Sequence, residues 1–194
     1  MVLLLSSSIK PFPSLNKDKR YNPIDREKDY VKAVHFYLSK GFSVVLVDNS
    51  GYVSEELLSF KQKYINFEYL VFDTKQSHLG KAKGEIEIID SALENSKLLS
   101  EVDYLVKITG RYIIENINAL LSQVNLIGNS VYINPTRNLK WADTRLMIMS
   151  KVYYFNYFLP AVAHSDKKNQ ITYMETFFMK SLFMFLLDGG TMNL

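Results

Sequence analysis

The segment VDYLVKITGRYI, residues 102–113, decides the fold that the sequence predicts. Its apolar part consists of bulky, β-favouring residues without polar alternation, which is typical of a strand buried on both faces of a parallel sheet. Lys107 interrupts this run, and Thr109, Gly110 and Arg111 close it. In open α/β sheets ligands bind at the carboxyl ends of the strands, so we expect these residues at a binding site.

The residues alone leave two interpretations of the cations Lys107 and Arg111 open. A guanidinium presents a planar fork of donors suited to phosphate or carboxylate, and Gly110 lets the backbone come close to such a ligand. The alternative is that both cations pair with acidic neighbours in a structural network. The functional interpretation requires a nucleotide-binding α/β layer around the segment.

Strand and helix patterns alternate along the rest of the chain. Apolar runs predict further strands at residues 2–5, 42–47, 67–72, 130–134 and 146–149. Amphipathic stretches predict a helix that starts at Pro23 and stops at Gly41, a second helix that starts at Ser54, and a third that includes Ile86 and runs to about Leu99. Further helices are predicted over residues 114–124, 152–159 and 173–187. This order predicts an α/β fold, a Rossmann-like, mostly parallel sheet flanked by helices in one domain.

Composition limits the class of protein. The chain has 194 residues, 47% hydrophobic and 22% charged, which suits a globular domain with an ample core. A net charge of +3 and a pI near 8.8 suit anionic substrates or a membrane face, without the dense basic blocks of a nucleic-acid binder. The absence of cysteine excludes disulfides and thiolate metal sites and favours a reducing compartment. The apolar run near residue 1 is too short to predict a signal peptide or a membrane span.

Three polar stretches follow strands and each has two interpretations. Residues 6–8 are expected in a loop whose hydroxyls either face a ligand or belong to an ordinary polar loop. Asp48 ends the second strand and either contacts a nucleoside or caps the next turn. Residues 80–85, GKAKGE, do not match the Walker pattern, but they either approach an anion at a helix N-terminus or form a solvated basic loop. GxGxxG, HExxH and GxSxG motifs are absent.

Two residues near the C-terminus have similar alternatives. Trp141, the only tryptophan, either stacks on a sugar or base or lies in the core or at its rim. Glu175 begins an aromatic helix, where a carboxylate either acts as a general base with a raised pKa or faces solvent. That helix is too short for a bilayer span and is expected in the core or at a membrane surface.

Six segments carry a family resemblance. They are DREKDYVKAVHFYL (25–38), VLVDNSGY (45–52), GKAKGE (80–85), VKITGRY (106–112), DTR (143–145) and the region around Glu175. As a set, in this order and spacing, they resemble bacterial GT-A-type glycosyltransferases of surface-polysaccharide synthesis, which make capsule, O-antigen or lipooligosaccharide. The resemblance extends over nearly the whole chain.

The resemblance implies a single GT-A-like domain with a donor half of about residues 1–112 and a short acceptor half of about residues 113–194. It implies a hexosyltransferase-type enzyme that moves a sugar from a nucleotide-sugar, a UDP-sugar being favoured, to a glycan or lipid-linked acceptor. We expect a cytoplasmic location. The mild basicity and the aromatic C-terminal helix add peripheral contact to the inner face of the membrane as an option, since lipid-linked acceptors reside there.

The resemblance also implies roles for particular residues. The implied donor-binding residues are Ser7, Asp48, Asn49, Gly80, Lys81, Lys107, Thr109, Gly110, Arg111 and Arg145. Residues 109–111 would take the place of a metal-binding Asp-x-Asp motif, so cations would neutralise the diphosphate, although a divalent metal (Mn or Mg) stays open. Glu175 would be the base, with Asp143 and Asp166 as substitutes. The alternatives are a nucleotidyltransferase, a non-catalytic nucleotide-binding domain and an anion-bridged assembly protein.

Overall fold

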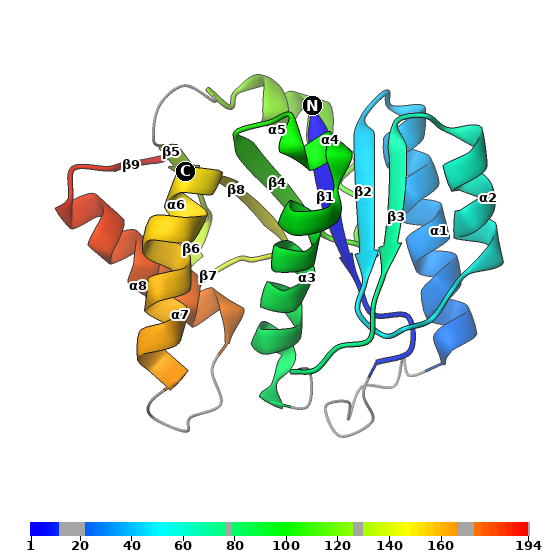
Figure 1. Cartoon of the computed structure of the whole chain (residues 1–194). Helices are drawn as coiled ribbons and strands as arrows, with labels where there is room; N and C mark the ends of the chain where they lie inside the picture. Colours follow the sequence, from blue (N-terminus) through cyan, green and yellow to red (C-terminus); the bar gives the residue numbers. More distant parts are fainter. Residues whose placement is uncertain (12–21, 77–78, 126–129, 167–172, 194) are drawn as a thin grey trace. The chain divides into compact units, whose positions relative to one another are not determined.

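The computed structural model describes residues 1–11, 22–76, 79–125, 130–166 and 173–193, with the side chains of residues 164–166 excepted. Figure 1 shows the course of the chain. The elements are β1 (Val2–Ser7), α1 (Pro23–Ser39), β2 (Ser43–Asp48), α2 (Glu55–Lys63), β3 (Phe67–Val71), α3 (Lys81–Asn95), α4 (Lys97–Ser100), β4 (Tyr104–Thr109), α5 (Ile117–Ser122), β5 (Ser130–Tyr132), β6 (Pro135–Thr136), β7 (Trp141–Ala142), β8 (Leu146–Ser150), α6 (Lys151–Tyr153), the π-helical η3 (Tyr154–Phe158), α7 (Leu159–Asp166), α8 (Met174–Leu187) and β9 (Thr191–Asn193).

Seven strands form one sheet in the order β3-β2-β1-β4-β8-β5-β9, and β6 and β7 form a separate antiparallel pair. Parallel pairing joins β1 to β2, β2 to β3 and β5 to β9, whereas β5 and β8 are antiparallel. The predicted α/β fold with a mostly parallel sheet flanked by helices is therefore confirmed.

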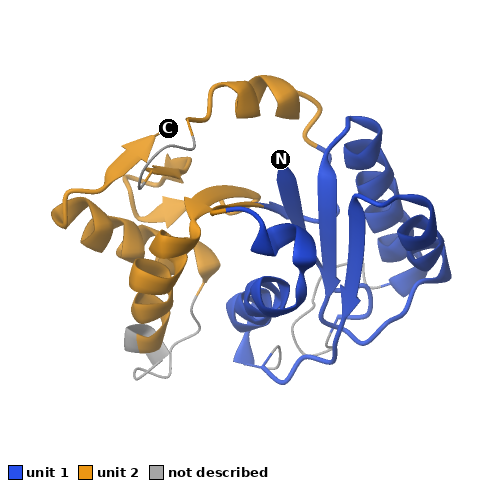
Figure 2. Cartoon of the chain, turned by 45° about the horizontal axis from the view of Figure 1, so that its top comes forward, with its two compact units in different colours: residues 1–102, 107–113 blue, residues 103–106, 114–194 orange. Residues whose placement is uncertain are grey.

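The chain divides into two compact units (Figure 2). Unit 1 consists of residues 1–102 and 107–113, and unit 2 of residues 103–106 and 114–194. The strand β4 contributes residues to both units, so the chain passes between the units within residues 102–114.

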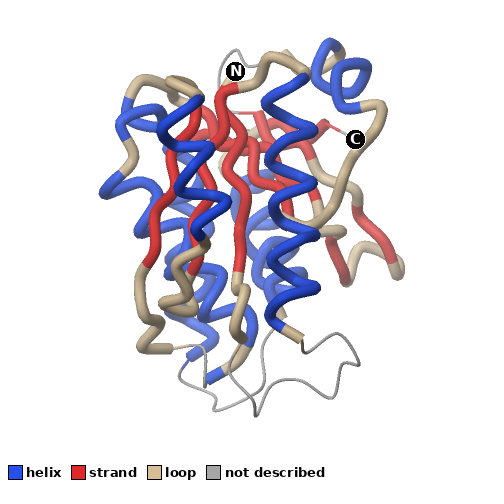
Figure 3. The backbone as a smooth tube through the Cα atoms, turned by 90° about the vertical axis from the view of Figure 1, so that its right-hand side faces the viewer, coloured by secondary structure: helices blue, strands red, loops and turns tan. Residues whose placement is uncertain are grey.

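In unit 1 the strands β1, β2 and β3 run between α3 on one side and the pair α1 and α2 on the other (strands red, helices blue in Figure 3). Residues 44–47 of β2 are fully buried, as expected for a strand covered on both faces. The Asn22 side chain accepts a hydrogen bond from the Ile24 amide at 3.0 Å, and Pro23 is the first residue of α1. The predicted start of this helix is confirmed.

Unit 2 has an aromatic core between α8 and the continuous helical run of α6, η3 and α7. The ring of Tyr153 packs edge-on against Phe185 at a centroid distance of 5.1 Å, and Phe158 lies 5.9 Å from Phe178. The Tyr153 hydroxyl is 2.6 Å from the Ser181 hydroxyl, which satisfies its polar end inside the core. In the part of the chain that the structure describes, no helix is long and apolar enough to cross a bilayer.

Some boundaries in unit 1 differ from the prediction. Ser6 and Ser7 lie inside β1, because that strand continues to pair with β2 as far as Asp48. Residues 81–85 form the first turns of α3 and are not a loop before it. The helix predicted to reach about Leu99 ends at Asn95, because the Ser96 hydroxyl caps the separate helix α4.

Unit 2 shows similar differences. The helix expected over 114–124 is only α5, and its expected Gly128-Asn129 end lies outside the described residues. The expected loop 135–141 contains β6 and the first residue of β7. Of the expected polar loop after α7, residues 164–166 belong to α7 itself. The sequence also missed β9, because so short a strand exists only through its pairing with β5.

Candidate functional site

The carboxylate of Asp48, at the end of β2, is entirely buried and accepts four hydrogen bonds. Its Oδ2 accepts from the Ser7 hydroxyl at 2.9 Å and the Ile9 amide at 2.8 Å. Its Oδ1 accepts from the Ser50 amide at 2.9 Å and the Ser50 hydroxyl at 2.5 Å. These donors compensate the carboxylate for the water it loses on burial. Asp48 thus fastens the loop after β1 to the turn after β2.

This geometry bears on two predicted donor-binding residues. Of the two interpretations of Asp48, the structure shows the turn cap, and a direct contact with a nucleoside stays a prediction. The Ser7 hydroxyl also donates toward the Val47 carbonyl and is only 2% exposed, so in this state it is engaged within the protein. Both residues shape the end of the sheet by holding its loops.

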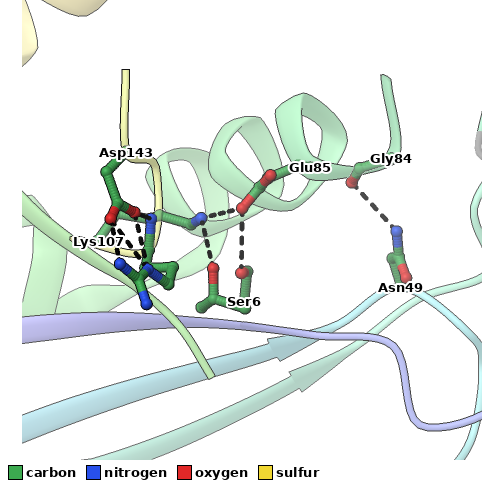
Figure 4. Close-up of polar contacts among 8 residues, drawn as sticks. Ser6, Asn49, Gly84, Glu85, Lys107 and Asp143 are labelled. Carbon is green, nitrogen blue, oxygen red and sulfur yellow. Dashed lines mark hydrogen bonds and ion pairs between the residues drawn. The ribbon is translucent and has the colours of Figure 1, made fainter. Parts of the chain in front are cut away.

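Lys107 forms a buried ion pair with Glu85 of α3, drawn in Figure 4. The lysine side chain is 0% exposed and that of the glutamate 21%. The same Glu85 oxygen accepts from the Ser6 hydroxyl at 3.3 Å, and the ammonium lies 3.5 Å from the Thr109 hydroxyl. For Lys107 the structure therefore shows the acidic neighbour of the structural interpretation. Thr109 is drawn into the same network.

A second contact joins α3 to the sheet. The Asn49 side-chain amide donates to the Gly84 carbonyl at 3.1 Å (Figure 4). Gly80, with φ 136°, is the residue before α3, and Lys81 is the exposed first residue of the helix. Gly80 and Lys81 thus lie where a helix N-terminus meets solvent, and their predicted contact with a donor stays a prediction, as does that of Asn49.

Gly110 is required for a reason that the sequence did not reveal. A Cβ at this position would lie 2.6 Å from the Ser6 carbonyl oxygen and 3.3 Å from a ring carbon of Tyr30. The Gly110 amide donates to that same Ser6 carbonyl at 2.9 Å. The close approach that this glycine allows is therefore to β1 itself, and a ligand is not needed to explain it.

Arg111 differs from Lys107 in its surroundings. Among the residues that the structure describes, its buried Nη1 has no hydrogen-bond partner. Its guanidinium lies 6.0 Å from the centre of the Tyr112 ring. A buried guanidinium nitrogen without an acceptor is costly and suggests that an anion completes the site.

A second guanidinium lies in the same part of unit 1. Arg26 donates from Nε to the Ser8 carbonyl at 2.9 Å and from Nη2 to the Tyr30 hydroxyl at 3.1 Å. Burial raises the pKa of Tyr30, and the positive charges of Arg26 and Arg111 lower it in part. Tyr30 therefore stays neutral, and its hydroxyl also accepts from the Ser8 amide at 3.2 Å. The two arginines give this end of the sheet a positive potential suited to a phosphate.

The sequence analysis did not select Arg26 or Tyr30 as site residues. Their spacing of four places both on one face of α1, directly after the helix start, and this is the signal that could have found them. Glu85 was likewise missed as the partner of Lys107, although it stands within the GKAKGE segment.

The predicted catalytic carboxylates all lie in unit 2. Asp143 pairs with Arg145, whose Nε lies 2.9 Å from Oδ1 and 3.0 Å from Oδ2, and whose Nη2 also contacts Oδ2. The hydrogen bonds from Arg145 lower the pKa of Asp143, which makes this carboxylate a weaker base. In this state the two side chains are partners of each other, and the predicted base role of Asp143 and donor-binding role of Arg145 stay predictions.

Glu175 and Asp166 remain as candidate bases. Glu175 lies in the first turn of α8 and is half-buried. Its burial alone therefore does not decide between a general base and a solvent-facing glutamate. Asp166 is the last residue of α7, and its side chain lies outside the described residues. The base role of both residues stays a prediction.

No family model and no curated protein sequence matches this chain. Solved structures do match it. The glycosyltransferase GlyE of Streptococcus pneumoniae TIGR4 superposes with a TM-score of 0.55 at 7% identity over 100% of this chain and 44% of its own. A protein assigned as a nucleotide-diphospho-sugar transferase from Desulfovibrio desulfuricans G20 superposes with a TM-score of 0.51 at 12% identity, over 100% of this chain and 78% of its own.

The chain therefore shares its fold with these two proteins. The inositol-1-phosphate CTP transferase of T. maritima matches less well, with a TM-score of 0.49 at 18% identity over 99% of this chain and 82% of its own. The present chain spans less than half of the length of GlyE. At these identities the likeness establishes the fold alone.

The residues at the close of β4 do not fit a divalent metal. In place of an Asp-x-Asp motif the chain has residues 109–111, whose side chains are a hydroxyl, a hydrogen and a guanidinium. The carboxylate of Asp48 at the end of β2 already accepts four hydrogen bonds within the protein. Hard divalent cations need oxygen ligands, and this set offers too few.

Proposed function

We propose that this chain is a glycosyltransferase that moves a sugar from a nucleotide-sugar donor, with a UDP-sugar favoured, to a glycan or lipid-linked acceptor. The observation that carries the proposal is the buried Nη1 of Arg111, which has no hydrogen-bond partner among the described residues. It lies just beyond β4 in a sheet with the nucleotide-diphospho-sugar transferase fold, and ligands of such sheets bind at strand carboxyl ends.

The charge at this site supports a diphosphate as its ligand. In the reaction, the bond between the anomeric carbon and the diphosphate oxygen breaks while an acceptor hydroxyl oxygen bonds to that carbon. The leaving diphosphate gains negative charge, and preformed guanidinium donors stabilise such charge. Arg111 would supply these donors without a metal ion, and Arg26, whose Nε and Nη2 bond to Ser8 and Tyr30, would add positive charge. Lys107 is already paired with Glu85.

The acceptor hydroxyl must lose its proton as it attacks. We propose Glu175 as the base that takes the proton, since Asp143 is paired with Arg145 and has a lowered pKa. An acceptor in bacterial surface-polysaccharide synthesis and a cytoplasmic location are supported by the resemblance of the segments 25–38 and 45–52. Exposed apolar side chains on α8, such as Leu187 at 87% exposure, support a peripheral membrane contact.

Thermal denaturation with UDP, GDP, CMP and their sugars, with Mn²⁺ or with chelator, tests the donor site. A ligand that binds the native state raises the midpoint of unfolding. We expect one nucleotide to raise it in the presence of chelator. Arg111→Ala should lower the affinity for that nucleotide by roughly 10- to 100-fold, because a hydrogen bond to a charged group contributes about 1.5–3 kcal/mol.

Two further variants sharpen this test. Arg111→Lys keeps the charge without the fork and should lose part of the affinity. Lys61→Ala removes an exposed cation from α2 and should bind the nucleotide as the wild type does. A midpoint that rises only with Mn²⁺ would contradict the cationic site, and no rise with any nucleotide would contradict the transferase. Release of free nucleotide from the donor separates a transferase from a binding protein.

A further inference from the structure

The surface formed by Arg137, Trp141 and Tyr173, here called the aromatic platform, belongs to unit 2 and has no role in the donor site. The elements β7 and α8, at which Trp141 and Tyr173 stand, are in contact with each other (Figure 1). Two of its members come from the β6–β7 hairpin, and the third directly precedes α8.

The turn of this hairpin has an unusual backbone. Three consecutive residues, Arg137, Asn138 and Leu139, have φ values of 52°, 55° and 63°. The left-handed conformation costs about 1–2 kcal/mol for a residue with a Cβ, and only asparagine among the three adopts it readily. Such strain persists where the surrounding structure imposes it, and it is concentrated at functional sites.

The strained turn brings the Arg137 side chain back over the ring of Trp141. The guanidinium carbon lies 4.6 Å from the ring centre, which is a cation–π contact. Within the described part of the chain, the Arg137 side chain makes no hydrogen bond or ion pair and contacts no other ring. Its N–H donors are therefore held in place and are open to a ligand.

Tyr173 completes the platform from α8. Its ring centroid lies 5.2 Å from that of Trp141 with the rings tilted at 49°, and its side chain is 52% exposed. The Tyr173 carbonyl accepts from the Thr176 amide at 3.0 Å and from the Thr176 hydroxyl at 2.8 Å, which fixes the backbone that carries the ring. The ring is anchored but remains in contact with solvent.

This placement contrasts with that of the aromatic side chains in the core of unit 2. The core of unit 2 buries Tyr153 and Phe178 almost completely, so aromatic rings of this unit can be accommodated in its interior. A half-buried tryptophan ring and an exposed tyrosine ring beside an oriented guanidinium have the chemistry of a saccharide site. The C–H face of a sugar ring carries slight positive charge and packs on the negative face of an aromatic ring, while the guanidinium donates to sugar hydroxyls.

We propose that the aromatic platform binds a saccharide ring and serves as the acceptor subsite. The acceptor role rests on the proposed function, whereas saccharide binding does not. Glu175 stands two residues after Tyr173 in the first turn of α8, so one ring of the platform directly precedes the helix that carries the candidate base.

The single tryptophan of the chain makes the test direct, because all tryptophan emission comes from Trp141. The intact protein is titrated with neutral and acidic mono- and oligosaccharides up to about 50 mM, a range that covers dissociation constants in the millimolar region. We expect a saturable change in emission and protection of Trp141 from acrylamide quenching. Tyr173→Ala and Arg137→Ala should each weaken binding by about three- to tenfold, since an aromatic contact contributes roughly 0.5–1.5 kcal/mol.

Phe183→Ala is the matched control, because Phe183 is an aromatic residue of α8 that is 47% exposed and outside the platform. It should bind the saccharide as the wild type does. Circular dichroism confirms that each variant is folded, and the nucleotide-induced rise in unfolding midpoint should be unchanged in all of them.

The outcomes separate the two proposals. If the nucleotide raises the midpoint but no saccharide changes the emission, the subsite is wrong and the donor site stands. If a saccharide binds on the platform but no nucleotide binds, saccharide binding by the platform is upheld, and the transferase and with it the acceptor role are wrong. A change in emission caused by nucleosides but not by saccharides, or equal weakening by Phe183→Ala, would overturn the subsite.

Discussion

Replacing Lys107 by methionine removes one charge from an ion pair at the centre of unit 1. The lysine is 0% exposed, and its partner Glu85 is 21% exposed. Breaking a buried ion pair by removing one partner costs about 3–5 kcal/mol, because the remaining charge is left uncompensated. In Lys107→Met, Glu85 remains in contact with solvent and keeps its hydrogen bond from Ser6. We therefore expect the free energy of unfolding to fall by about 3 kcal/mol, the lower end of this range.

The second single variant and the double variant define the coupling. Glu85→Gln leaves the wholly buried ammonium of Lys107 without its carboxylate and should cost about 3–5 kcal/mol. The double variant removes both charges, so we expect it to cost about 3 kcal/mol, much less than the sum of the singles. The interaction energy between the two residues should therefore be about 3–5 kcal/mol.

Urea denaturation followed by circular dichroism measures all four proteins. The matched control is the cycle for Asp143 and Arg145, where the arginine is 65% exposed and the coupling should stay below about 1 kcal/mol. A coupling near zero for Lys107 and Glu85 would refute the reasoning. So would a Lys107→Met protein of unchanged stability that no longer binds nucleotide, since Lys107 would then be a donor ligand.

Three other variants test the structure at separate places, and urea denaturation measures the free energy of unfolding of the first two. Asp48→Asn should lower the free energy of unfolding by about 2–4 kcal/mol, because the new amide N–H group would face hydrogen-bond donors; a change below about 0.5 kcal/mol would contradict the network. Phe185→Ala should lower the free energy of unfolding by about 3–5 kcal/mol, because Phe185 is only 2% exposed. Phe183→Ala is the control, because Phe183 is 47% exposed, and it should change that free energy by less than about 0.5 kcal/mol. Equal losses of stability in both variants would contradict the packing. Arg145→Ala should raise the pKa of the Asp143 carboxyl toward its ordinary 3.8 in an NMR titration. Because the pKa is lowered in the folded protein, this pair stabilises at neutral pH and its contribution is lost as the pH falls below 3.8, where wild type and Arg145→Ala should converge.

The elements that the sequence predicted well are those with strong local signals. The run 42–47 is apolar except for Ser43 and forms most of β2, a buried strand. The Asn22-Pro23 pair begins α1, because a cap and a fixed φ act within one turn of the chain. Such signals need no partner elsewhere in the molecule.

The short strands were missed because they lack such signals. The strand β9 has three residues and exists through its pairing with β5, and β6 and β7 have two residues each. Their backbone hydrogen bonds are made with segments distant in sequence or across a strained turn. Local propensity has little influence over so few residues.

The candidate site shows the same division. The sequence by itself determined that cations end the central strand and that no carboxylate accompanies residues 109–111, because these are facts of composition. Only the tertiary structure decided between the two cations. Packing of α3 brings Glu85 against Lys107, whereas no described acceptor reaches Nη1 of Arg111. The pairing of a buried charge depends on which distant side chain the fold brings within a few ångströms, and no local pattern encodes that.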